Sequence, residues 1–81
     1  MKFIIIEIDG YVNQVILTGR KCSKQQLKQM YFQVKELTRE TSDLPKIFCR
    51  LHKFEQVSYS EDIEVDFVID LDTDRIYSPS Y

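Results

Sequence analysis

An aspartate–glycine pair between two β-branched apolar runs constrains the fold of this 81-residue chain more than any other feature. The pair at positions 9–10 separates an apolar run at residues 2–8 from a second run at residues 11–18. A two-residue hairpin loop requires positive φ at its central positions, which aspartate and glycine accept. The pattern predicts an antiparallel hairpin in which Ile4 faces Val15.

Both faces of this hairpin are largely apolar. A single helix covers only one face of a sheet, so the second apolar face would contact water unless something covers it. We expect a homodimer or another protein as the cover, and a strongly twisted sheet that folds over itself is the equal alternative. The face expected to bind a partner consists of Phe3, Ile5, Val12 and Ile16.

The middle of the chain predicts one amphipathic helix. Ser23 and Gln26 have the spacing of a capping box, so the helix should begin there. Pro45 disfavours helical geometry at Leu44, and the helix should therefore end near residues 41–42. Phe32 falls outside the apolar stripe. The stripe itself, at three- and four-residue spacing, consists of Leu27, Met30, Tyr31, Val34, Leu37 and Thr41.

Three strands are expected after this helix. Residues 46–54 are interpreted as a strand that places Cys49 in the core. Residues 63–71 alternate between apolar and acidic side chains, which is typical of a half-buried antiparallel strand with an acidic outer face. A turn then leads into a short strand at residues 75–77. The chain is therefore predicted to be a single α+β domain over residues 1–81, an antiparallel β-sheet in the order β-β-α-β-β-β with one helix packed on one face.

The charges are divided unevenly along the chain, although the net charge is only −2 and the pI about 5.3. Residues 19–53 carry nine cations against three acids, whereas residues 54–81 carry one cation against eight acids. Such asymmetry can mark a nucleic-acid surface or an acidic decoy, but charges that are distant in sequence can also neutralise each other in a sheet.

The acidic strand is the first candidate binding surface. Carboxylates on one face of a strand repeat about every 7 Å, which is the order of the phosphate spacing along one strand of nucleic acid. The alternative is that cations on the neighbouring strand (Lys46, Arg50 and Lys53) pair with these acids within the fold. The predicted row consists of Glu64, Asp66, Asp70 and Asp72.

The loop before the helix is the second candidate surface, for an anion or a nucleic acid. Cations lie there beside a helix N-terminus, where the helix dipole already places partial positive charge. A solvated loop is the alternative, and the negative net charge argues against a nucleic-acid domain, which is usually basic. The candidate residues are Arg20, Lys21, Lys24 and Lys28, with Lys35 further along the helix.

The acidic turn that begins at Asp70 resembles the start of a calcium loop but departs from it at two essential positions. Arg75 stands where the sharp turn needs glycine, and Tyr81 stands where the bidentate glutamate belongs. No calcium site is predicted.

Cys22, Cys49 and His52 are too few for structural zinc, which takes four ligands. On the expected strand Cys49 and His52 also point to opposite faces, which forbids both a shared metal and a cysteine–histidine catalytic pair. His52 is expected to pair with Glu64 or Asp66. We therefore expect no catalytic residues, no metal and no cofactor.

The apolar run at residues 3–6 is too short for a signal core or a membrane span, so we expect a cytoplasmic protein with reduced thiols. The function predicted is a small non-catalytic binding or regulatory protein that occupies a surface of a partner protein. It would be an inhibitor or adaptor, of a class that phages and mobile elements also encode. The alternatives are a nucleic-acid- or anion-binding module that uses residues 20–39, and a self-assembling structural subunit.

Overall fold

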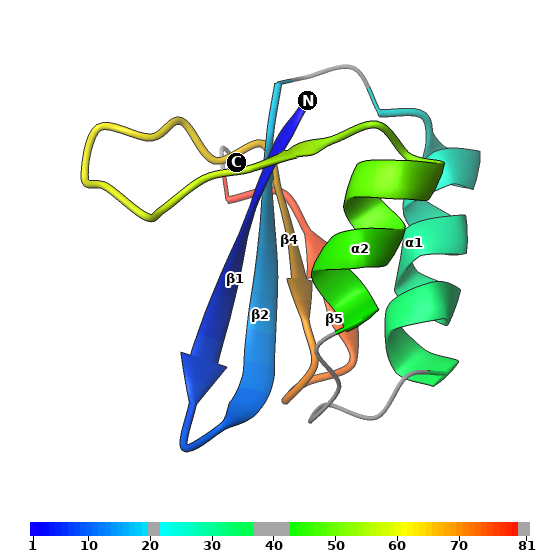
Figure 1. Ribbon diagram of the computed structural model, residues 1–81, viewed down its shortest axis with the longest axis horizontal. Coiled ribbons are helices and arrows are strands. Elements are labelled where there is room, and N and C mark those ends of the chain that lie inside the picture. Colours follow the sequence, from blue (N-terminus) through cyan, green and yellow to red (C-terminus); the bar gives the residue numbers. More distant parts are fainter. Residues whose placement is uncertain (20–21, 37–42, 80–81) are drawn as a thin grey trace.

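The computed structural model describes residues 1–19, 22–36 and 43–79 as a five-stranded sheet with two helices on one face (Figure 1). The strands lie in the order β3-β1-β2-β4-β5, and β3 runs parallel to β1 while the other neighbours are antiparallel. The α+β class is as predicted, but the predicted order β-β-α-β-β-β is wrong because a second helix precedes β3, and the sheet is only mostly antiparallel because β3 pairs in parallel with β1. The elements are β1 Lys2–Ile8, β2 Tyr11–Thr18, α1 Lys24–Glu36, α2 Asp43–Leu51, β3 Glu55–Gln56, β4 Phe67–Asp70 and β5 Arg75–Tyr77.

The first hairpin forms as predicted, but its two strands pair in a different register from the predicted one. Asp9 and Gly10 have φ of 54° and 83°, as a two-residue loop requires. A β-bulge opposite Ile6 and Glu7 then shifts the pairing by one residue, so Ile4 faces Ile16. A one-residue slip moves side chains to the other face of a sheet.

The bulge therefore divides the residues that were predicted to share one open apolar face, and that prediction is wrong. Phe3 and Val12 are buried under the helices, with Ile5 half-buried beside them, whereas Ile16 lies on the opposite face. Three of the four expected contact residues consequently have almost no surface to offer a partner.

Helix α1 begins where the capping box places it. The Gln26 backbone N–H donates to Ser23 Oγ at 3.1 Å, which satisfies one of the unpaired donors at the helix start. Leu27, Met30 and Val34 are buried against the sheet. The predicted end of the helix, with Leu37 and Thr41, lies outside the described residues.

The strand predicted at residues 46–54 is wrong, because residues 43–51 form helix α2. Pro45 lies in the first turn of this helix, where backbone N–H groups have no intrahelical acceptor and the missing donor costs nothing. Leu44 and Phe48 are buried at a four-residue spacing. Cys49, expected in the core, is exposed.

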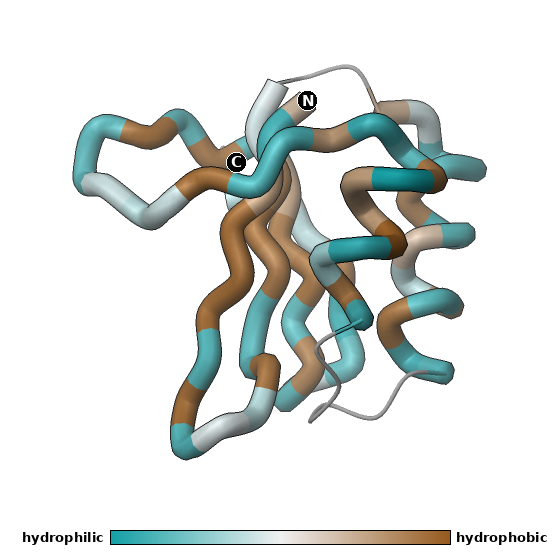
Figure 2. The backbone as a smooth tube through the Cα atoms, viewed as in Figure 1, coloured by the Kyte–Doolittle hydropathy of each residue, from teal (hydrophilic) through white to brown (hydrophobic). Residues whose placement is uncertain are grey.

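Three phenylalanine rings pack together among the aliphatic residues of the core between the helices and the sheet. The Phe48 ring packs edge-on against Phe3, with ring centroids 5.0 Å apart, and against Phe54 at 6.3 Å. Edge-to-face pairs at such distances add to the free energy gained by burial alone. In Figure 2 the upper parts of β1 and β2 are mostly hydrophobic where they pass beside the helices.

The chain's own segment 57–66 covers part of the sheet face opposite the helices (Figure 1). The Asp66 backbone N–H donates to the Leu17 carbonyl at 2.9 Å, which fixes the segment to β2. The long strand predicted at residues 63–71 is therefore reduced to β4. The second hydrophobic cluster contains Ile4, Ile16 and Val68, with Ile6, Val57, Ile63, Val65 and Tyr77 packed against it.

Candidate functional site

The four acids predicted to form one binding row lie in different environments. Asp70 is only 9% exposed, Asp66 is half-buried, and Glu64 and Asp72 are exposed. Asp66 Oδ2 accepts a hydrogen bond from the Gly19 backbone N–H at 2.6 Å. Because β4 begins only at Phe67, these residues do not continue along one strand face.

Asp70 stabilises the turn between β4 and β5. Its carboxylate accepts from Gln14 Nε2 at 3.1 Å and from the backbone N–H groups of Asp72 and Thr73 at 2.9 and 3.3 Å. Burial alone would raise the pKa of Asp70, but the hydrogen bonds from Gln14, Thr73 and Asp72 outweigh it and lower the pKa. This carboxylate is therefore engaged within the fold.

His52 connects the end of α2 to α1. Its Nε2 atom lies 2.7 Å from Gln33 Oε1, and its ring lies between Phe48 and Phe54 at centroid distances of 5.7 and 5.5 Å. The expected pairing with Glu64 or Asp66 is wrong, because residues 43–51 are a helix on the other side of the sheet. Burial among these rings lowers the pKa of the imidazole.

The thiols and acids do not assemble into a metal centre in the part of the chain that the structure describes, where no three His, Cys, Asp or Glu side chains lie close enough to share an ion. Cys22 is half-buried before α1, and burial raises the pKa of its thiol. A raised pKa leaves less of the reactive thiolate at neutral pH.

The basic residues predicted to bind an anion are only partly described. Arg20 and Lys21 lie outside the described residues, while Lys24 and Lys28 are exposed on α1. Lys35 lies 3.8 Å from Asp74 and 5.5 Å from the centre of the Tyr31 ring.

Lys46 and Arg50 are not placed to neutralise the acids from a neighbouring strand. They lie on α2, so the predicted cross-strand pairing is wrong. Lys46 Nζ is instead 3.7 Å from Asp43 Oδ1, one turn earlier in the same helix.

The two signs of charge are therefore concentrated in different parts of the structure, although Asp74 of the β4–β5 turn reaches Lys35 on α1. Residues 22–36 and 43–53, which form the helical layer, carry six cations and two acids. Residues 55–79 carry eight acids and one cation, and their 57–66 segment lies on the other face from the helices (Figure 1). This separation gives the helical layer a positive field.

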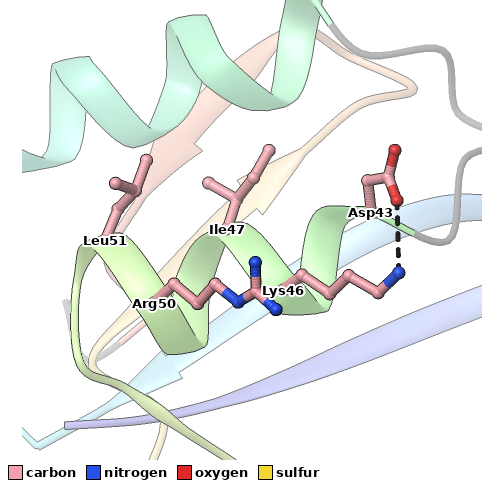
Figure 3. Close-up of a pocket in the computed structure, with 5 residues that line it drawn as sticks. All are labelled: Asp43, Lys46, Ile47, Arg50 and Leu51. Atoms are coloured by element: carbon pink, nitrogen blue, oxygen red, sulfur yellow. Dashed lines mark ion pairs between the residues drawn. The ribbon is translucent and has the colours of Figure 1, made fainter.

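Two shallow grooves meet on the outer side of the helical layer. The first has a volume of about 460 Å³ and is formed along α2, where Ile47 and Leu51 lie on the same side of the helix (Figure 3). The second has about 480 Å³ and lies between α1 and the end of α2. Leu51 lines both. The first groove is completed by Asp43, Lys46 and Arg50, and the second by Gln29, Phe32, Gln33, Glu36 and His52.

The grooves expose two large apolar side chains. Phe32 is 60% exposed on α1, and Leu51 is 65% exposed at the end of α2. Together with the half-buried Ile47, they form what we call the helical patch. Phe32 could be found from the sequence, since it falls outside the apolar stripe. Leu51 could not, because the sequence predicts a strand at residues 46–54 and the exposure of Leu51 depends on helix α2.

Comparisons of the chain with protein-family models, with curated proteins and with solved structures found no match. Neither of the described helices is long and apolar enough to cross a membrane.

Proposed function

We propose that this protein is a small non-catalytic binding protein, an inhibitor or adaptor, that occupies a surface of a partner protein through the helical patch. The observation that carries the proposal is the exposure of Phe32 and Leu51 beside a shared groove. Isolated exposed apolar residues are ordinary on protein surfaces, but large apolar residues grouped around a groove are typical of interaction sites.

The composition of the patch and its rim also resembles that of an interface. Binding energy concentrates on a few aromatic, arginine and large apolar residues near the centre of an interface, surrounded by a polar rim. Here Phe32 and Leu51 supply the apolar centre, while Arg50, Gln29 and Gln33 lie around it. A partner that covered the patch would remove both large side chains from water, which favours association by about 25 cal/mol for each Å² of apolar surface buried.

The charge of the helical layer favours an acidic partner surface. Asp43 and Glu36 line the grooves together with Lys46 and Arg50, so the positive charge comes from the helical layer as a whole, which carries six cations against two acids. Complementary charge at the rim of an interface mainly accelerates association and excludes partners of the same sign.

The test is a comparison of what the protein captures in the cells that express it. A Phe32→Ser, Leu51→Ser variant removes the patch, and a Tyr59→Ser variant removes one similarly exposed side chain in the 57–66 segment, outside the patch. We expect the partner to be lost only by the patch variant, with affinity reduced at least about a hundredfold if both residues are hot spots. A partner that the patch variant retains, or that the control loses, would contradict the proposal.

Nucleic-acid binding is the second candidate, and the separation of charge favours it. Four acids that would repel a phosphate backbone lie in the segment 57–66, across the sheet from Lys24 and Lys28. If this function is correct, a Lys24→Glu, Lys28→Glu variant will bind nucleic acid more weakly and with a smaller salt dependence. Unchanged affinity and salt dependence would exclude it.

The third candidate, a structural subunit that only assembles with itself, requires a molecular mass that rises with concentration in the purified protein. A constant mass over the same concentration range would exclude self-assembly, and protein binding and nucleic-acid binding would remain as candidates.

A further inference from the structure

Strand β1 is paired on its outer side for only part of its length. The Met1 and Phe3 carbonyls accept from the Glu55 and Val57 backbone N–H groups, both at 3.0 Å, and β3 pairs only with Lys2 and Phe3. In an antiparallel ladder both backbone groups of a residue point to the same side, and successive residues alternate. The odd-numbered residues of β1 therefore point away from β2.

Ile5 and Glu7 are the next odd-numbered residues along this strand. Their N–H and C=O groups point to the outer edge, where the described part of the chain supplies no strand beyond Gln56. Figure 1 shows the lower half of β1 at this edge, away from the 57–66 segment. Unpaired backbone groups in a row are a template for another strand.

The side chains beside this edge are of two kinds. Ile6 and Ile8 alternate onto the face opposite the helices, where Ile8 is 54% exposed and its partner Tyr11 is 46% exposed. Glu7 is exposed and alternates onto the other face. A strand added here would thus meet an apolar strip on one face and a carboxylate on the other.

We propose that the edge at residues 5–8 binds an extended segment of another protein by strand addition. The segment carries a basic residue opposite Glu7 and apolar residues on either side of it, which pack beside Ile6 and Ile8. Backbone hydrogen bonds supply the affinity in this mode of binding, and alternate side chains supply the specificity. This surface is separate from the helical patch.

A second copy of the chain does not fit this edge. Two copies of β1 could pair about a two-fold axis at Glu7, which would place two carboxylates directly opposite each other. An axis at Ile6 would instead place Ile8 beside Ile4 of the other copy, where Val57 already runs along the strand. Like charge and steric overlap therefore leave a different, basic chain as the occupant.

The probe that tests this proposal is a capped pentapeptide of sequence Thr-Val-Lys-Val-Thr, compared with the same peptide containing glutamate in place of lysine. Both are titrated into the whole protein while amide hydrogen exchange and chemical shifts are recorded by NMR. Without peptide, the Ile5 and Glu7 amides should exchange much faster than those of Ile4 and Ile6. The lysine peptide should slow exchange at Ile5 and Glu7 and bind about fivefold more tightly than the glutamate peptide.

Two variants at Glu7 and one control variant test whether the carboxylate and the backbone edge are responsible for binding. Glu7→Lys should reverse the preference between the peptides, while Glu61→Lys, an exposed acid in the 57–66 segment, should leave it unchanged. Glu7→Pro removes the carboxylate and a donor that points to the edge but breaks no bond to β2, so it should weaken the lysine peptide and abolish the preference between the two peptides.

Several results would overturn the proposal. Slow exchange at Ile5 and Glu7 in the protein alone would show that the edge is already closed. Protection that increases with protein concentration would identify a second copy as the occupant. Shifts confined to α1 and α2, or equal binding of both peptides to every variant, would also exclude strand addition.

Discussion

Replacing Phe48 tests the helical assignment of residues 43–51 and the core that depends on it. The side chain is fully buried and its ring contacts those of Phe3, His52 and Phe54. Truncation of such a residue to alanine typically costs about 3–5 kcal/mol of the free energy of unfolding. Native domains have only about 0.05–0.15 kcal/mol per residue, or about 4–12 kcal/mol for a chain of this length.

Phe48→Ala therefore removes a large part of the stability, and Phe48→Leu is the variant that still folds. Leucine keeps the apolar contact but loses the ring edges, which we expect to cost about 1–1.5 kcal/mol. With a urea m-value of about 1 kcal/mol/M, the unfolding midpoint should fall by about 1–1.5 M. Unfolding is followed by circular dichroism at several urea concentrations.

Cys49→Ala is the matched control, because Cys49 is the next residue and is exposed on α2. Alanine is favoured in helices, so the free energy of unfolding of this variant should stay within about 0.5 kcal/mol of the wild type. In the strand that the sequence suggested, Cys49 would be the core residue. A larger loss from Cys49→Ala than from Phe48→Leu would refute the packing of α2.

Two further predictions concern pH. Asp70 has a lowered pKa in the folded protein, so its contribution to stability is present above its ordinary value of 3.8 and is lost as the pH falls through the lowered value. Asp70→Asn should cost about 1 kcal/mol at pH 7 in urea unfolding, and the difference should vanish in strong acid; a constant difference would contradict the hydrogen-bond account. His52 also has a lowered pKa, so its contribution is complete above 6.5 and is lost as the pH falls below it. His52→Gln should flatten the decline of Tm between pH 7 and 5, and equal slopes would contradict the buried, neutral imidazole.

Local signals in the sequence predicted the parts of the fold that local interactions determine. The loop at Asp9 and Gly10 and the Ser23 cap depend on neighbouring residues alone, and the positive φ values and the Gln26 N–H to Ser23 Oγ bond are as expected. Pro45 did not distinguish a strand from helix α2 in the following residues. A proline is compatible both with the end of one helix and with the first turn of the next.

Non-local contacts determined what the sequence could not predict. The bulge opposite Glu7 changed which residues of β2 face the helices, and nothing in a single sequence marks it. The segment 57–66 covers the sheet face opposite the helices, for which the sequence predicted either a partner or a curled sheet as the cover, and that face carries Ile4 and Ile16 rather than Phe3, Ile5 and Val12. The helical patch could not be predicted for the same reason, because Leu51 lies near Phe32 only when α2 packs beside α1.

Site-specific photo-crosslinking tests the helical patch most directly. A photoreactive amino acid placed at position 51 or position 32 is compared with one at position 59, whose tyrosine is similarly exposed in the 57–66 segment. The proposed function predicts that one and the same acidic partner protein is crosslinked from positions 51 and 32 and not from position 59. Crosslinks to that partner from position 59 alone, or crosslinks only to nucleic acid, would contradict it.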